Sequence, residues 1–258
     1  MTAAYRRWRA VGVVAAVLLT LTGAGQTWRA LAQQDRSDGY RYPQITALDL
    51  DLQNASTQVT PSVSGEVEVS QSTHWTVSQP VVKREVVDGR LKISVRCPEV
   101  FPIGAPNCRT NLTIGVPADT KVSVRGSSAD TAITGLTGEL NLHATSGTFA
   151  LSDDTGRVTA QVTSGSVTGR GLSSSQVQAQ VTSGSVNLTF ISAPEVVALS
   201  AGSGSVRALF PQGTTYRVAV STGSGGSTVD RQLQDPASQR SVTATADSGS
   251  VTLKYADN

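Results

Sequence analysis

The stretch QVTSGSV at residues 161–167 returns letter for letter at residues 180–186. Looser versions flank this pair: ATSGTF at 144–149, AGSGSV at 201–206, STGSGGSTV at 221–229 and ADSGSV at 246–251. Their central glycines are separated by 18, 19, 20, 21 and 24 positions, and they are Gly147, Gly165, Gly184, Gly204, Gly225 and Gly249. A period in this range is typical of a repeat architecture in which each copy is one structural unit.

Within each copy, apolar and polar residues alternate in a fixed phase relative to the glycine. Val158, Ala160 and Val162 precede Gly165, with Thr and Gln between them, and the next copy repeats this row. The pattern predicts a strand, a Ser-Gly turn at which glycine supplies a positive φ, and a second strand. Because one such unit cannot bury its apolar row alone, we expect an all-β fold of stacked copies, a β-helix or β-solenoid. An antiparallel β-sandwich is the alternative that short alternating strands also allow.

The N-terminal part of the chain is typical of an export segment. Three arginines lie in residues 1–9, and residues 10–28 are uncharged and reach from Arg9 to Trp28 and Arg29. As a helix, that segment would span about 28 Å, close to the thickness of the hydrocarbon layer of a bilayer. The basic residues in front predict a cytoplasmic N-terminus and a transmembrane anchor at 10–28, so that everything after Arg29 lies outside the cell membrane.

A cleaved signal peptide is the competing interpretation of the same segment. The triplet Ala-Leu-Ala at residues 30–32 satisfies the small-x-small rule, which predicts cleavage after Ala32 and secretion. In either case, residues 29–38 are expected to be a polar linker and residues 39–258 an extracytoplasmic β-repeat domain. Both interpretations export the same domain.

The repeat pattern is interrupted at about residues 71–117, which we interpret as a non-repeat insertion. The insertion holds the only two cysteines of the chain, Cys97 and Cys108. Export places them in an oxidising compartment, so a disulfide between them is expected rather than a metal or redox pair. Because the region also contains Trp75 and Phe101, it is the candidate interaction region of the molecule.

Residues that could carry out catalysis are sparse. The two histidines lie in unrelated contexts: His143 is expected on the polar face of a strand, and His74 beside Trp75. Neither histidine has the partners of a Ser-His-Asp triad or a Cys-His pair at a spacing that would indicate a catalytic site. The carboxylate pairs Asp153-Asp154 and Asp49 with Asp51 are expected to be solvated. The sequence thus predicts a protein that is not an enzyme, with no cofactor and no metal site.

Charge also limits the partners that we expect. The formal net charge is +2, and the chain has no run of Lys and Arg outside the arginines near the N-terminus. Nucleic-acid binding needs a basic footprint, so no nucleic acid is expected as a partner.

Over nearly its whole length the chain resembles a family of exported bacterial proteins, common in actinobacteria, known as β-strand-repeat "putative adhesins" of unknown function. The resemblance lies in the Arg-rich start, the apolar segment ending at Trp28, VDGRLKI at residues 87–93, Cys97-Pro98 with Cys108, and the repeats. It implies a single-stranded right-handed β-helix. Relatives often carry Asp-Ala-Gly-Asp-Val at the turn, where this chain has Ser-Gly-Ser-Val. The resemblance therefore does not imply an acidic or metal-binding ladder in this chain.

These features lead to one principal hypothesis and two alternatives. The principal one is a non-enzymatic, membrane-anchored surface module whose rows of Thr, Gln and Ser bind a cell-envelope polymer or a surface protein. The first alternative is an envelope-sensing regulatory protein that acts through a membrane partner. The second is a polysaccharide-active enzyme, which would need clustered Asp with Arg or Lys on one stacked face.

Overall fold

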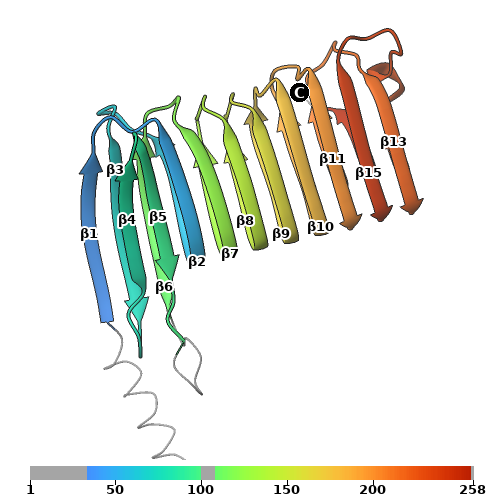
Figure 1. Cartoon of the computed structure of the whole chain (residues 1–258). Coiled ribbons are helices and arrows are strands. Elements are labelled where there is room, and N and C mark those ends of the chain that lie inside the picture. Colours follow the sequence, from blue (N-terminus) through green and yellow to red (C-terminus); the bar gives the residue numbers. More distant parts are fainter. Residues whose placement is uncertain (1–33, 100–107, 257–258) are drawn as a thin grey trace, which may run out of the picture.

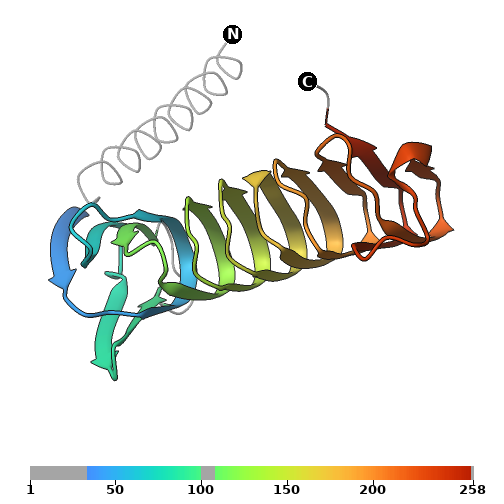
Figure 2. The ribbon, with the colours of Figure 1, turned by 90° about the horizontal axis from the view of Figure 1, so that it is seen from above.

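The computed structural model describes residues 34–99 and 108–256. These residues form one sixteen-stranded sheet that coils into an elongated stack, with one short 3₁₀-helix, η1 (Arg231–Leu233) (Figures 1 and 2). The strands are β1 (Gln34–Tyr42), β2 (Ala47–Pro61), β3 (Val67–Trp75), β4 (Val81–Val87), β5 (Arg90–Arg96), β6 (Arg109–Val116), β7 (Lys121–Thr134), β8 (Leu140–Ser152), β9 (Val158–Leu172), β10 (Gln176–Phe190), β11 (Val196–Ser203), β12 (Val206–Phe210), β13 (Arg217–Ser224), β14 (Ser227–Val229), β15 (Ser241–Ser248) and β16 (Val251–Tyr255).

The repeated copies pair in parallel and in register. Gln161 of β9 pairs with Gln180 of β10, and Gly165 pairs with Gly184. The same pairing extends back through β8 and β7 and forward through β11 with β12 and β15 with β16. A solenoid requires parallel pairing of this kind, whereas a sandwich built from hairpins pairs its strands antiparallel. The all-β solenoid is therefore confirmed, and the sandwich alternative is wrong.

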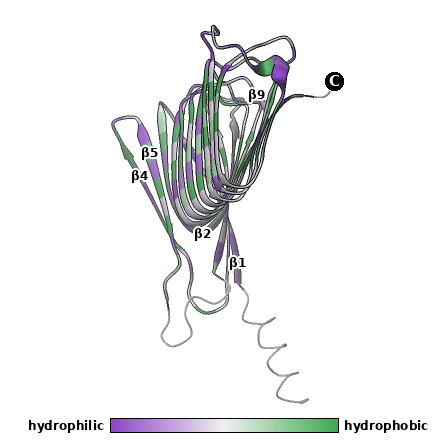
Figure 3. Cartoon of the chain, turned by 90° about the vertical axis from the view of Figure 1, so that its right-hand side faces the viewer, coloured by the Kyte–Doolittle hydropathy of each residue, from purple (hydrophilic) through white to green (hydrophobic). Residues whose placement is uncertain are grey.

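Each copy forms one rung of the stack, with two strand segments that meet at a corner. We call the segments before the corner the first wall and those after it the second wall; in β9 they are residues 158–163 and 166–172. Val158, Ala160 and Val162 of the first wall and Val167 of the second point inward and are buried. Figure 3 shows the resulting alternation of hydrophobic and hydrophilic residues along each strand. The core is thus a narrow column of apolar side chains that no single rung could shield from water.

The corner is occupied by the predicted glycines, which stack on one another. Gly147, Gly165 and Gly184 form one ladder, with φ between +126° and +142°. A Cβ built on Gly165 would lie 1.9 Å from the carbonyl oxygen of Gly147. Both the backbone conformation and the close approach of the next rung therefore require glycine at this position.

At both ends of the stack, the order of the rungs departs from the order of the sequence. β2 lies between the rung of β5 and β6 and the strand β7, although β5 and β6 follow it in the chain. The last rung in the chain, β15 with β16, lies between β11 with β12 and β13 with β14. The final spatial rung is therefore the next-to-last in the sequence.

The segment at residues 71–117 contributes a rung of its own. β5 pairs in parallel with the first-wall half of β2, and β6 pairs with its second-wall half. The reason is visible in the sequence, because LKISV at 91–95 and LTIGV at 112–116 carry inward apolar rows of the repeat type. The hairpin strand β4 extends the first wall beyond β5, and β3 and β1 extend the second wall beyond β6, all antiparallel.

The predicted disulfide closes the corner of this rung. Cys97 and Cys108 are bonded at an S–S distance of 2.03 Å, and both are buried. They follow β5 and precede β6, where the later rungs have Ser-Gly-Ser. The expected disulfide is thus confirmed, and it joins the two walls of one rung.

The predicted linker at residues 29–38 needs a correction. Residues 34–38 belong to β1, which pairs antiparallel with β3 along its full length. Polar side chains are compatible with this exposed edge because main-chain hydrogen bonds to β3, rather than the burial of side chains, hold β1 in place. The predicted anchor at residues 10–28 lies outside the described residues. In the described part of the chain, no helix is long and apolar enough to cross a membrane.

Candidate functional site

The candidate interaction region is only partly within the described chain. Phe101 lies outside the described residues. Trp75 is half-buried at the end of β3. The pairing of His74 with Arg109 places Trp75 next in register to Cys108, beside the disulfide. His74 itself is hydrogen-bonded through Nδ1 to the Asp35 carboxylate and lies 3.3 Å from the Ser72 hydroxyl.

A groove that the sequence did not predict crosses the outer surface of the second wall. Its floor is one row of residues that the strand registers align across β1, β3, β6, β2, β7 and β8. In spatial order, the row is Gly39, Ser70, Thr113, Gln58, Ala132 and Ala150. We call this row and its flanking residues the outer groove; it runs along the stacking axis, across the strands.

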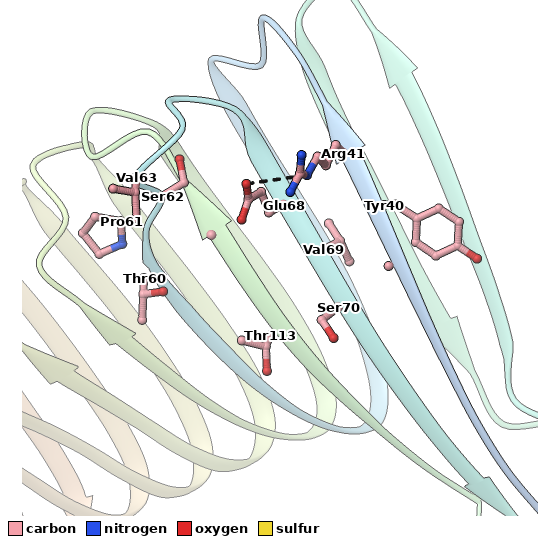
Figure 4. A pocket seen from close by; sticks show the side chains of 12 residues that line it. Tyr40, Arg41, Thr60, Pro61, Ser62, Val63, Glu68, Val69, Ser70 and Thr113 are labelled. Atoms are coloured by element: carbon pink, nitrogen blue, oxygen red, sulfur yellow. Dashed lines mark ion pairs between the residues drawn. The ribbon is translucent and has the colours of Figure 1, made fainter.

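The end of the outer groove near β1 is a hollow of about 590 Å³ (Figure 4). It arises because Gly39 and Gly115 leave the surface without side chains, while the turn after β2 stands beside it. A Cβ on Gly39 would meet no atom within 4 Å. Ser62 and Val63 of the turn line the hollow, and Val63 is fully exposed.

The rim of this hollow carries one charge of each sign. Arg41 of β1 and Glu68 of β3 are paired strand neighbours, and their Nε and Oε1 atoms lie 3.7 Å apart. The Ser64 hydroxyl donates a hydrogen bond of 3.0 Å to the same Oε1 atom. Because this ion pair is exposed, it contributes little to stability. Its two groups remain able to bind polar ligand groups.

The outer groove continues over β2, β7 and β8 as a second hollow of about 340 Å³. Thr113 lines both hollows, and Gln58 stands in the floor row next to it. Beyond Gln58 the floor is made by the methyl groups of Ala132 and Ala150. The rim there carries Asn111, Ser56, Asp130 and Thr148. A small apolar floor between polar rims suits a flat, extended ligand with hydroxyl or amide groups at its edges.

The outer surfaces of the remaining rungs bear the rows that the sequence predicted. On the second wall, the floor row continues through Thr168 and Asn187 to Arg207. On the first wall, Gln161 pairs with Gln180, and both are exposed. Extended rows of Ser, Thr, Asn and Gln therefore line both walls.

The expected solvation of the carboxylate pairs holds for Asp153 and is wrong for Asp154. Asp154 is fully buried, and its Oδ1 accepts a 2.8 Å hydrogen bond from the Leu136 amide. Its Oδ2 accepts a 3.2 Å bond from the Ser152 amide. Burial raises the pKa of Asp154 to about 6, although these two hydrogen bonds oppose the shift. The carboxylate lies inside the stack and does not reach the outer groove.

The other carboxylate pair makes exposed contacts across the first wall. Asp49 is ion-paired with Arg90 at 3.0 Å, and Asp51 with Arg96 at 2.5 Å. The hydrogen bonds from Arg96 lower the pKa of Asp51. Within residues 34–99 and 108–256, no group of three or more His, Cys, Asp and Glu side chains could hold a metal ion.

Comparisons with known proteins agree with a repeat solenoid. The model of the family described as "Toastrack DUF4097" matches residues 158–258, the C-terminal part of the array. None of the curated proteins matches the sequence. The match agrees with the resemblance to a repeat family of unknown function for this part of the chain, whereas an actinobacterial origin stays a prediction.

Several solved structures are similar to the chain, and three of them are described here. The first, a "putative cell adhesion protein" from Clostridium sporogenes, is 14% identical, with a TM-score of 0.44 over 87% of this chain and 100% of the other. The second, a "putative adhesin" from Bacteroides fragilis, is 13% identical, with a TM-score of 0.41 over 86% and 97%. The third, a "putative adhesin" from Parabacteroides distasonis, is 12% identical, with a TM-score of 0.45 over 85% and 97%.

Proposed function

We propose that this protein is a non-enzymatic surface module that binds an extended polymer of the cell envelope, or an extended segment of a surface protein, along the outer groove. The observation that carries the proposal is the alignment of the floor row across six strands. A groove that runs along the stacking axis favours a linear ligand over a compact one, because successive ligand units meet successive rungs.

The chemistry of the outer groove supports a neutral, hydroxyl-rich or amide-rich ligand. Gln58 and Thr113 can each donate and accept hydrogen bonds at the centre of the floor. Ala132 and Ala150 offer apolar contact to the face of a flat unit. With Arg41 and Glu68 on one rim and Asp130 on the other, no single sign of charge dominates.

We further propose that the module works outside the cell membrane. The disulfide between Cys97 and Cys108 supports this location, because such bonds persist in oxidising compartments. The uncharged segment at residues 10–28 would tether the module, with the N-terminus in the cytoplasm. Cell fractionation with N-terminal sequencing tests the tether: a soluble product that begins at Gln33 would establish cleavage instead.

A binding screen tests the proposed ligand class. The detergent-solubilised full chain is applied to an array of envelope glycans and to a pull-down of surface proteins. We then compare the wild type with A132Q and A150Q, which fill the outer groove with a neutral side chain. A198Q, at an outward position of the first wall, is the matched control.

The proposal expects A132Q and A150Q each to weaken binding about tenfold or more, while A198Q binds as the wild type does. Loss of one or two good polar or apolar contacts would account for a change of this size. The proposal fails if no polymer or protein is retained, or if the two groove variants bind as tightly as the control.

A further inference from the structure

The hairpin of β4 and β5 stands out from the side of the stack (Figures 2 and 3). β4 is its outer strand and pairs antiparallel with β5. No other strand in residues 34–99 and 108–256 pairs with β4. One side of β4 is therefore a strand edge without a neighbour in the described part of the chain.

The main-chain groups on this edge are unused. The two-residue turn between β4 and β5 makes Val87 and Arg90 a hydrogen-bonded pair. Because successive residues of a strand point their main-chain groups alternately to its two sides, those of Val82, Arg84 and Val86 point away from β5. Among the described residues, no main-chain hydrogen bond other than those to β5 involves β4. The edge is thus able to pair with a further strand.

The same edge exposes apolar side chains to water. Val81, Val86 and Val87 are 43%, 50% and 62% exposed. Cross-strand contacts between β-branched side chains stabilise a sheet. A strand added at this edge would therefore remove apolar surface from water as well as satisfy the main chain.

The sequence of β4 is symmetric about its central residue. It reads VVKREVV, with two valines at each end and with Lys83 and Glu85 on either side of Arg84. When two such strands pair antiparallel about Arg84, each Lys83 faces Glu85 of the other strand. Charged side chains on an edge discourage pairing with most strands, but they favour a strand whose charges run in the reverse order. A second β4 is such a strand.

We propose that β4 pairs antiparallel with β4 of a second copy of this chain, about a twofold axis through Arg84. In this register Val81 faces Val87 of the other copy, and Val82 faces Val86. The residues that face each other across the edge with outward main-chain groups can then exchange hydrogen bonds directly. A shift by one residue would place inward side chains beside outward ones, so the register is specified.

Arg84 meets Arg84 of the other copy at the axis, and contacts within each chain keep the two charges apart. The guanidinium carbon lies 3.7 Å from the centre of the Tyr40 ring. Nη2 of the same guanidinium donates a hydrogen bond to the Gln71 side chain. Because Tyr40 and Gln71 belong to β1 and β3, each guanidinium is held against the second wall of its own chain.

The proposed dimer is independent of the ligand proposed for the outer groove. β4 extends the first wall, whereas the outer groove crosses the outer surface of the second wall. Failure of the binding screen would therefore leave the dimer standing, and the reverse also holds. A twofold contact between two edges closes on itself and gives a dimer rather than a fibre.

Charge reversal tests the register. K83E places two acidic side chains opposite each other, E85K places two basic ones there, and the double variant K83E/E85K restores opposite charges. Sedimentation velocity of the full chain in a non-ionic detergent measures the dimer fraction. We expect a dimer for the wild type and the double variant, and a dissociation constant raised at least about tenfold for each single variant.

Two controls separate loss of the dimer from loss of the fold. An equal mixture of K83E and E85K should dimerise, because each variant then meets a partner of opposite charge. K254E, at an exposed position of β16, should dimerise as the wild type does. Since Glu85 also faces Lys92 within its own hairpin, urea unfolding of each variant verifies that the monomer is folded.

Disulfide trapping provides a second measurement. V81C/V87C should form a covalent dimer on mild oxidation, because the two positions face each other between copies. V81C alone and V87C alone should not, since each position lies about 20 Å from its own equivalent in the other copy. A wild-type monomer at all concentrations overturns the proposal, as does a K83E dimer as tight as the wild type or equal trapping of the single and double cysteine variants.

Discussion

Gly184 lies directly over Gly165 in the corner ladder, so that a Cβ on Gly184 would lie 1.7 Å from the Gly165 carbonyl oxygen. The φ of Gly184 is +134°, in a region that side-chain-bearing residues rarely adopt. A change to alanine therefore forces two rungs apart and strains the backbone as well.

We expect Gly184→Ala to lower the free energy of unfolding by about 3 kcal/mol or more, as for overpacking combined with a strained backbone. Urea unfolding followed by circular dichroism measures the loss. Gly226→Ala is the control, because Gly226 has no positive φ and a Cβ there meets no atom within 4 Å. Equal stability of the two variants would contradict the ladder.

Asp154 should make the protein less stable as the pH rises from about 4 to about 6. Its folded-state pKa of about 6 lies above the ordinary value of 3.8. As the pH rises, Asp154 therefore ionises at a lower pH in the unfolded chain than in the folded one, where burial disfavours the charged form. The contribution is fully present below about pH 4 and is lost as the pH rises through 6, with a total of about 3 kcal/mol.

Unfolding free energies measured between pH 4 and pH 7 check this slope. Asp154→Asn should flatten it, since the amide does not titrate. Asp153→Asn should keep most of it, because Asp153 is exposed and its charge is the smallest of the causes that raise the pKa of Asp154. An unchanged slope in Asp154→Asn would assign the pH dependence to other groups.

Arg84 of β4 should hold the β4–β5 hairpin against the antiparallel strands β1 and β3. Its guanidinium carbon lies 3.7 Å from the centre of the Tyr40 ring, and its Nη2 donates a 2.5 Å hydrogen bond to Gln71. Arg84→Ala should cost about 1–2 kcal/mol and speed hydrogen exchange in β1 and β3. Lys83→Ala, on the opposite, exposed face of β4, should leave the exchange unchanged.

The disulfide should stabilise the rung of β5 and β6 by about 2–3 kcal/mol, because it closes an eleven-residue separation in the unfolded chain. The double variant C97S/C108S should lose this amount in urea unfolding. Dithiothreitol should lower the stability of the wild type and leave the double variant unchanged. A loss in both would mean that the reductant acts elsewhere.

The central repeats could be predicted from the sequence because the residues of QVTSGSV at 161–167 meet the same residues at 180–186. Gln161 on Gln180 and Gly165 on Gly184 follow from the period alone. The order of the end rungs could not be predicted in this way, since Val197 of β11 accepts Val242 of β15 as readily as it would Val218 of β13. Parallel strands whose apolar residues fall at the same alternate positions can pair with one another in any order. Only the connecting segments decide which of them become neighbours.

The outer groove was missed for a related reason. Its floor joins Gly39, Ser70 and Thr113 from three antiparallel neighbours with Ala132 and Ala150 from the parallel array. No sequence spacing relates these residues, because the chain reverses direction twice among them. Asp154 was misassigned because its neighbour Asp153 is exposed, and a Gly-bounded turn gives no sign of which carboxylate faces the core.

The position of β15 and β16 between two earlier rungs separates the order of synthesis from the order of assembly. When residues 217–229 are synthesised, their final neighbour, residues 241–255, has not yet been made. The growing chain can add rungs in sequence order up to β12. β13 and β14 cannot take their final positions until β15 and β16 have been made. The last strands, β15 and β16, insert between two earlier rungs and so complete the stack. A chain that lost them would leave β13 and β14 without a parallel neighbour.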